Sequence, residues 1–223
     1  MAKNNEETMM KTYYTILSVF ILIFALNLRA EDVNDIIENV QETYEDMDYL
    51  SATFKQIETF KLTGSVSETI GKIYVSSGEK YRFESENQII ATDGKTVWAF
   101  NRNTNQLLID RVRENSSILL PRDLLFKYPK MYFATLLKTE NDSGKKLYVI
   151  KMDPKEDVYG YVKSMKIWVE DDTWLIRKVE TVDLRNNSST FEITDIDTKT
   201  KLSDKLFSIH ADEGVEIIDR RQN

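Results

Sequence analysis

The feature that most constrains the fold is the dipeptide Asp93-Gly94, which stands within a stretch of β-branched and aromatic residues (89–100). Asp-Gly favours the positive φ angles of a two-residue type I′ hairpin, and its flanks favour strands. Alternation along the second strand places Trp98 and Phe100 on one face. Two large aromatic side chains need apolar cover. We therefore expect them to turn toward the helices of the protein, with ordinary core packing as the alternative.

The N-terminal residues resemble a secretory signal peptide. Lys11 precedes an apolar run (16–28), and Ala30 follows the run directly before an acidic segment. The run is short for a bilayer span of about 20 residues. We expect residues 1–30 to be a cleaved signal peptide and residues 31–223 to form a single domain in the periplasm. An uncleaved anchor is the alternative, and Met1, Met9 and Met10 remain candidate starts.

Composition narrows the function classes. The chain has no cysteine, so it offers no disulfide, thiol nucleophile or thiolate metal site. Its only histidine, His210, lies in a strand-like stretch, and one histidine cannot supply the usual zinc sites. The net charge of −7 argues against nucleic acid and against charge-driven binding to anionic head groups. We expect a binding protein and not an enzyme, with no cofactor and no metal.

Two pairs of acids are the nearest approach to catalytic chemistry. Asp171-Asp172 and the pair Asp195 and Asp197 match the residue types of a glycosidase. The first pair stands in a turn, where aspartate is favoured for local reasons. A glycosidase would also need two acids that face each other inside the fold.

An amphipathic helix opens the expected domain. Asp32 is suited to the N-cap of this helix. Apolar residues then recur at helical spacing: Val33, Ile36, Ile37, Val40, Tyr44 and Met47.

Short alternating segments separated by turn residues follow the helix. Apolar residues share one face in three of them: Leu50, Ala52 and Phe54; Ile73 and Val75; Tyr81 and Phe83. Lys72, Lys80, Arg82 and Glu84 fall on the opposite faces. The series continues in residues 107–111, 146–152, 165–170, 174–183 and 190–196. About ten strands predict a mainly β fold with a few helices (α+β), an antiparallel meander rolled into a barrel or half-barrel.

Residues 118–133 interrupt this pattern with a stretch too apolar for a surface loop. Pro121 and Pro129 can each begin a helical turn but cannot lie inside one, which predicts two short apolar helices against the sheet. Two interpretations fit this pattern equally well. The helices could fill the core permanently, or they could cover a ligand cavity.

Four motifs in order resemble the LolA-type outer-membrane lipoprotein carriers. They are Phe54-x-Gln56; residues 71–75 leading to 81–83; residues 92–98; and Leu206-Phe207-x-Ile209 followed by Gly214-Val215-x-Ile217. The resemblance covers residues 32–219. It implies an unclosed antiparallel barrel (half-barrel) whose concave apolar face is lidded by helices. It also implies a periplasmic chaperone of lipoprotein transport and outer-membrane biogenesis, which takes acylated lipoproteins from an inner-membrane ABC complex to an outer-membrane receptor. We expect a monomer.

The resemblance and the residue pattern together suggest an acyl-binding cavity and a lid. Tyr81 matches an aromatic position of the family, whereas the other wall residues rest on face alternation and helical spacing. The expected walls are Ile36, Ile37, Val40, Phe54, Tyr81, Phe83, Trp98 and Phe100. The expected lid is Leu119, Leu120, Leu124, Leu125 and Phe126.

The chain departs from the family at the lid latch. Ser76-Ser77-Gly78 stands where well-known members carry an Arg-Pro pair whose arginine latches the lid. We expect apolar contact to hold the lid, with Arg82 and Arg122 as candidate substitutes for the latch. The alternative function on the same fold is a carrier of free lipid or glycolipid, or a lipoprotein-sensing regulator of envelope stress.

Overall fold

The computed structural model describes residues 32–77, 79–112, 132–155 and 162–221 of the 223-residue chain. The expected signal peptide and all five residues of the expected lid lie outside these residues. In the described part, no helix is both long enough and apolar enough to cross a membrane.

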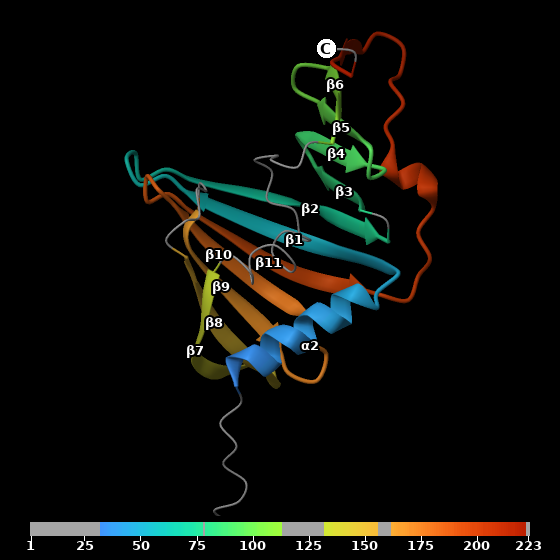
Figure 1. Ribbon diagram of the computed structural model, residues 1–223. Helices are drawn as coiled ribbons and strands as arrows, with labels where there is room; N and C mark the ends of the chain where they lie inside the picture. Colours follow the sequence, from blue (N-terminus) through green and yellow to red (C-terminus); the bar gives the residue numbers. More distant parts are fainter. Residues whose placement is uncertain (1–31, 78, 113–131, 156–161, 222–223) are drawn as a thin grey trace, which may run out of the picture. The chain divides into compact units, whose positions relative to one another are not determined.

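One sheet dominates the unit that runs from residue 33 to the C-terminus (Figure 1). A single α-helix, α2 (Val33–Glu45), precedes the strands in the described residues. The N-terminal strands are β1 (Tyr49–Thr59), β2 (Val66–Ser76), β3 (Lys80–Ser85), β4 (Gln88–Thr92), β5 (Thr96–Asn101) and β6 (Gln106–Arg111). The C-terminal elements are β7 (Tyr132–Asp142), β8 (Lys145–Pro154), β9 (Val162–Glu170), β10 (Ile176–Asp183), β11 (Ser188–Asp197), the 3-10 helix η2 (Asp204–Phe207) and β12 (Glu216–Asp219).

The twelve strands form one open sheet in the order β12-β6-β5-β4-β3-β2-β1-β11-β10-β9-β8-β7. Neighbours in sequence pair as hairpins on each side, and β1 pairs with β11 to join the two halves. β12 is the exception to antiparallel pairing, because it lies parallel to β6. The expected mainly β, unclosed fold is confirmed, although one strand departs from a simple meander.

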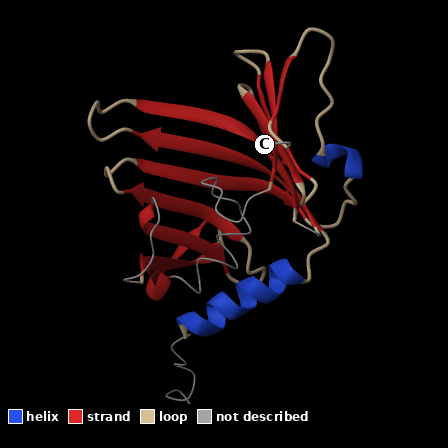
Figure 2. Cartoon of the chain, turned by 45° about the horizontal axis from the view of Figure 1, so that its top comes forward, coloured by secondary structure: helices blue, strands red, loops and turns tan. Residues whose placement is uncertain are grey.

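The helix begins one residue after Asp32, as predicted, but it ends at Glu45, before Met47, the last residue of the predicted stripe. Ile36 and Val40, one turn apart, are its buried residues. They pack into the main apolar cluster with residues of β7 to β10, such as Ile150 and Met165. Figure 2 shows α2 alongside the curved sheet.

Strand register defines two faces of the sheet, because directly paired residues point to the same side. We call the side that carries α2 the inner face and the other the outer face. Phe54 pairs with Gly71 and Ile193 on the inner face. The alternating burial of β1, in which Leu50, Ala52 and Phe54 are buried, confirms the predicted face of that strand.

The Asp93-Gly94 turn differs from the predicted type I′ geometry. Gly94 has a φ of 89°, but Asp93 is not among the residues with positive φ. The Asp93 carboxylate accepts hydrogen bonds from the backbone N–H groups of Lys95 (2.9 Å) and Thr96 (2.8 Å). Burial raises the pKa of Asp93, but these hydrogen bonds outweigh it and leave the pKa below its usual value. This local hydrogen bonding favours a wider loop, in which Thr92 and Val97 are the last pair.

Three further expectations were wrong. Tyr132 and Phe133 begin β7 instead of ending a helix, because Tyr132 is buried in the cluster beneath α2. Trp174 has a φ of 55° and precedes β10 in a turn. His210 is exposed and lies outside any strand.

The end of α2 is tied to the sheet by one hydrogen bond, from the Ile176 backbone N–H to the Tyr44 hydroxyl (3.3 Å). Burial raises the pKa of Tyr44 to about 12, although this hydrogen bond and Arg177 act in the opposite direction. The hydroxyl therefore stays protonated at neutral pH and remains in place to accept the hydrogen bond.

We expect Tyr44→Phe to lower the free energy of unfolding by about 1 kcal/mol, because it leaves the Ile176 N–H without this partner. Urea unfolding followed by circular dichroism measures the change. Tyr49→Phe, at the start of β1, is the matched control and should unfold like wild type. Equal stability of the Tyr44 variant and wild type would show that the hydrogen bond does not fasten α2.

Candidate functional site

The candidate site is the inner face of the sheet, which α2 divides into two parts. Over β7 to β10 the helix seals the face. The buried cluster there takes Ile36 and Val40 from α2 and Tyr148, Ile150, Ile167 and Val179, among others, from the strands. Ile37 packs against the edge of this cluster. In this half of the face, the apolar side chains of the strands are buried beneath α2.

An aromatic group marks the boundary of the sealed half. The ring of Phe54 stacks on that of Phe83, with centroids 4.3 Å apart, and lies 6.1 Å from that of Phe191. Phe191 packs against the sealed cluster, so the three rings connect it to β3. They form a continuous apolar surface across β3, β1 and β11.

Gly71 makes room for this aromatic group. It lies opposite Phe54, and a Cβ atom there would stand 2.4 Å from the Phe54 ring and 2.2 Å from the Glu84 carbonyl oxygen. The ring therefore lies over a strand position that has no side chain. A glycine in a strand interior often marks such a close approach.

Beyond Phe83 the inner face continues over β2 to β6 with apolar side chains that are only partly buried. Register places Tyr81 there, because it pairs with Val75 and Thr92. The other apolar members of this open half are Ile73, Val75, Ile90, Val97, Ala99 and Leu108. Their partial exposure contrasts with the burial of the strand side chains in the sealed half.

The structure brings together some of the predicted wall residues and separates others. Phe54, Tyr81 and Phe83 share the inner face. Trp98 and Phe100 do not, because they pair with Ala91 and Ile89, which belong to the outer face. The expectation that these two aromatics turn toward the helices is therefore wrong for α2, which lies on the other face. All five predicted lid residues lie outside the described residues.

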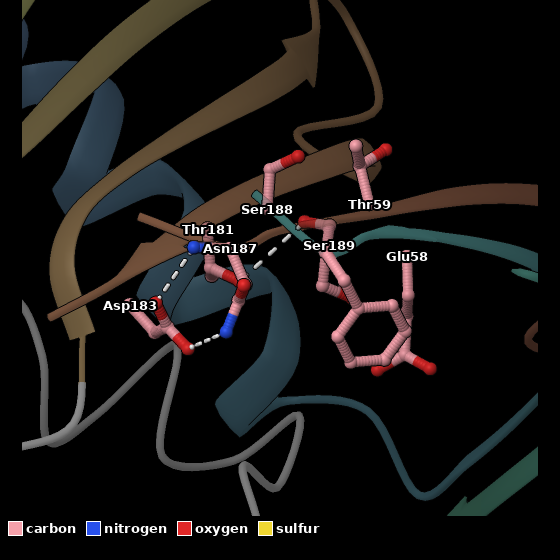
Figure 3. A pocket seen from close by; sticks show the side chains of 8 residues that line it. Glu58, Thr59, Thr181, Asp183, Asn187, Ser188 and Ser189 are labelled. Carbon is pink, nitrogen blue, oxygen red and sulfur yellow. Dashed lines mark hydrogen bonds between the residues drawn. The ribbon is translucent and has the colours of Figure 1, made fainter. Parts of the chain in front are cut away.

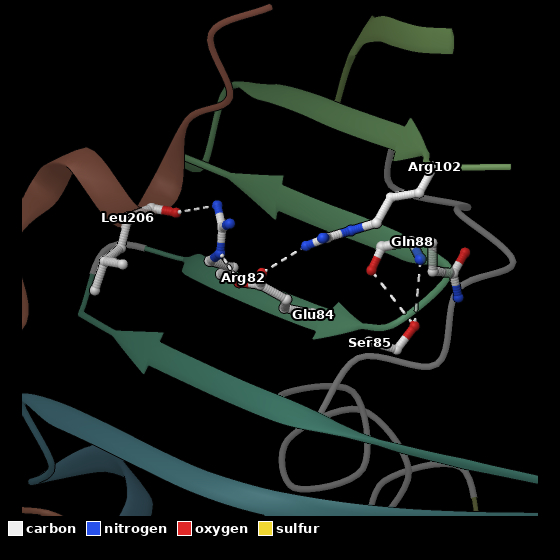
Figure 4. Close-up of polar contacts among 6 residues, drawn as sticks. All are labelled: Arg82, Glu84, Ser85, Gln88, Arg102 and Leu206. Atoms are coloured by element: carbon white, nitrogen blue, oxygen red, sulfur yellow. Dashed lines mark hydrogen bonds and ion pairs between the residues drawn. The ribbon is translucent and has the colours of Figure 1, made fainter. Parts of the chain in front are cut away.

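The C-terminal segment accompanies the outer face of β3 and β4 (Figure 4). Arg82 donates to Glu84 (2.9 Å) and to the Leu206 carbonyl oxygen (3.3 Å), and Arg102 also donates to Glu84. Lys80 pairs with Asp204 at 2.6 Å. Arg82 thus fastens η2 to the outer face and does not reach across the inner face as a substitute for the lid latch.

This outer side has its own buried group. Phe207 of η2 is buried, as are Ile89, Ala91 and Leu107 on the outer face of β4 and β6. Trp98 lies on this outer face. Its apolar cover is therefore associated with the C-terminal segment and not with α2.

Several charged side chains near the β9–β10 turn form ion pairs. Glu170 is buried and binds Arg177 and Lys145. Burial raises the pKa of Glu170, but the hydrogen bonds from these two cations outweigh it and hold the pKa below its usual value. Asp171 accepts a hydrogen bond from the Tyr148 hydroxyl (2.8 Å) and pairs with Lys146 (3.3 Å). The described residues contain no group of acids or histidine suited to hold a metal ion.

A small polar pocket opens where β1 and β10 end (Figure 3). Glu58, Thr59, Phe60, Thr181, Asp183, Asn187, Ser188 and Ser189 line it. Gln56 donates to Ser189 (3.1 Å) at the same end of the inner face. Most of its lining residues are polar or charged, in contrast to the aromatic residues around Phe54.

Sequence reasoning missed Phe191 of the aromatic group and the space that Gly71 leaves for the Phe54 ring. Phe191 lies in a segment predicted as a strand, and Gly71 interrupts another, so both carried a local signal. The sequence did not reveal the pairing of β1 with β11. This pairing brings Phe54 next to Ile193, although most of the chain separates the two residues in sequence.

The model of the family described as "Outer membrane lipoprotein carrier protein LolA" matches residues 45–210. An outer-membrane lipoprotein carrier protein of Histophilus somni (strain 2336) is 24% identical over 217 residues, which are 96% of this chain and 100% of that protein. One from Haemophilus influenzae (strain Rd) is 26% identical over 207 residues, with 91% and 96% covered.

Two uncharacterized proteins are also similar. That of Methanocaldococcus jannaschii is 23% identical over 215 residues, and these cover 92% of this chain but only 60% of its own length. The crystal structure of an uncharacterized conserved protein from Thermus thermophilus superimposes on this chain with a TM-score of 0.58 at 12% sequence identity. The match covers 85% of this chain and 100% of that protein. The latter similarity shows a shared fold.

We expect Gly71→Ala to lower the free energy of unfolding by about 1–3 kcal/mol, because the added methyl group overlaps the Phe54 ring and a backbone oxygen. Thermal and urea unfolding measure the change. Thr69→Ala, two residues earlier on the same face, is the control and should cost less. If both variants are equally stable, the aromatic group does not depend on the glycine.

Proposed function

The chain belongs to the LolA family, and from this premise we propose that it carries the acyl chains of lipoproteins on the inner face of its sheet. The observation that carries the proposal is the division of that face. α2 seals the half over β7 to β10, whereas the half over β2 to β6 has partly exposed apolar side chains.

The cost of moving acyl chains through water requires such a surface. Exposure costs about 0.8 kcal/mol per CH₂ group, or roughly 12 kcal/mol for a sixteen-carbon chain. Non-covalent affinity saturates near roughly 20 kcal/mol, and a carrier must also release its cargo. A broad apolar face with a movable cover meets both needs better than a closed pocket.

Within this proposal, Phe54, Tyr81 and Phe83 contact the acyl chains, and Ile36, Ile37 and Val40 anchor the helix at the border of the site. Leu119, Leu120, Leu124, Leu125 and Phe126 cover the cargo. Trp98 and Phe100 have no part in it, since they belong to the outer face.

The proposed route begins with a cleaved signal peptide at residues 1–30 and export of the single domain at residues 31–223 to the periplasm. There the monomeric carrier receives lipoproteins from an inner-membrane ABC lipoprotein-releasing complex. It delivers them to an outer-membrane receptor, without a cofactor and without covalent chemistry of its own. The family membership and the names of the Histophilus and Haemophilus relatives support this route.

The first test is Tyr81→Glu. A carboxylate stays hydrated on an unloaded face but has no partner against acyl chains, and an unpaired buried charge costs several kcal/mol. We expect the variant to fold and to lose at least about tenfold in affinity for a fluorescent triacylated peptide. It should likewise fail to release radiolabelled lipoprotein from spheroplasts.

The matched control for this test is Tyr74→Glu. Tyr74 is also a partly buried tyrosine, on the neighbouring strand, but it pairs with Arg82 on the outer face. The Tyr74 variant should bind the triacylated peptide and release lipoprotein from spheroplasts as wild type does. Thermal melts confirm that both variants fold. Equal binding by wild type and the Tyr81 variant would remove the inner face from the site. Binding of free lipid but not of acylated peptide would favour the free-lipid alternative.

A second test addresses the cover. Arg122 and Lys127 are trypsin sites within the proposed lid. We expect limited proteolysis there to be fast without cargo and slow with a bound triacylated peptide, because apolar contact with the cargo holds the lid. Mass spectrometry of the fragments locates the cuts. Equal protection in both states would indicate a permanently closed core.

A further inference from the structure

Large apolar side chains are exposed at two neighbouring hairpin turns. In the β1–β2 turn and its flanks Leu62 is 96% exposed, Val66 63% and Phe60 42%. Leu184, in the β10–β11 turn, is 66% exposed. We call residues 60–66 and 184–187 the two tips. Exposing four large apolar side chains to water is unfavourable. Their presence on two neighbouring turns therefore indicates an interaction site.

The two tips are held together and in shape. The Lys61 backbone N–H donates to the Asn187 side-chain oxygen at 3.0 Å, which links one turn to the other. Asp183 accepts from the backbone N–H groups of Arg185 and Asn187, each at 2.8 Å, and from the Asn187 side chain. Figure 1 shows the turns beside each other at one end of the sheet. The apolar side chains are therefore presented by a preformed pair of turns.

The charge around the tips differs from that of the whole protein. The chain carries a net charge of −7, whereas the two tips contain Lys61 and Arg185, and the acidic residues Glu58 and Asp183 border them. Lys163 adds a third cation, because its ammonium group donates to the Asn186 side chain at 2.8 Å. Apolar residues flanked by cations match the interface of an anionic lipid bilayer, where acyl chains lie beneath phosphate groups.

We propose that the two tips dock the protein on an anionic membrane surface by inserting Leu62 and Leu184 below the head groups. Side chains that project singly from turns suit a soft lipid interface better than the flat core of a protein interface. The tips lie at the ends of β1, β2, β10 and β11, so docking would bring that end of the sheet to the lipid. The proposal does not depend on which cargo the inner face carries.

Site-specific labels test the insertion. The chain has no cysteine, so single variants Leu62→Cys, Leu184→Cys and Ile217→Cys each take one NBD dye. Ile217 is the control, because it is 55% exposed and lies on β12. On mixing with vesicles of phosphatidylethanolamine and phosphatidylglycerol, emission at positions 62 and 184 should shift to the blue and rise about twofold. Emission at 217 should not change. The local labels separate the tips from any lipid contact of the apolar run 16–28.

Charge variants test the choice of lipid. In the Leu62→Cys protein, Lys61→Gln with Arg185→Gln should weaken the response to these vesicles by about tenfold or more. Lys72→Gln with Lys95→Gln, two exposed lysines outside the tips, should leave it unchanged. Vesicles of phosphatidylcholine alone should give a much weaker response than the anionic ones.

If the NBD emission at positions 62 and 184 stays the same as in water after anionic vesicles are added, the proposal is overturned, and the tips are left as a protein-docking site. An equal response at 62, 184 and 217 would overturn it as well, because the lipid contact would then not be local. Tyr81→Glu should preserve the tip response even where it abolishes cargo binding. Loss of cargo binding and loss of docking are thus distinguishable.

Discussion

The pairing of β1 with β11 is the contact on which the rest of the structure depends. It joins eight residue pairs from Ser51 with Asp197 to Thr59 with Ser188, with one irregularity near Ser51. On one side of it lie the hairpins of β1 to β6, and on the other those of β7 to β11. Without this pairing, the two halves would be separate sheets, each with an exposed edge. The ladder makes them one curved surface.

Continuity across the ladder explains why the inner face has two parts. α2 covers only part of a twelve-strand sheet, because a helix of 13 residues is about 20 Å long. The strands under the helix become core, and the strands beyond it keep apolar side chains near the surface. Phe54 stands on β1 at the boundary, where its ring contacts Phe83 on one side and Phe191 on the other. The buried core under α2 thus adjoins an apolar surface of partly exposed side chains.

Polar contacts secure the periphery of this sheet. Arg82 and Lys80 hold the C-terminal segment on the outer face, and Glu170 binds two cations near the β9–β10 turn. The β10–β11 turn uses Asp183 in the same way, through backbone and side-chain hydrogen bonds. Because these groups satisfy one another at the ends of strands, the inner face can remain apolar. The same polar turns present the exposed leucines of the tips.

The mainly β class, the first helix, most strand segments and the alternation within each strand could all be predicted from the residue pattern. These properties are local: a period of two fixes which residues share a face, and helical spacing fixes the stripe of Ile36 and Val40. Only the tertiary structure decided which face is the inner one. That choice depends on pairing between strands, and through Ala91 and Ile89 it places Trp98 and Phe100 on the outer side. The contact of Phe54 with Phe191 likewise requires β1 and β11 to meet, and no local pattern specifies a partner more than 130 residues away.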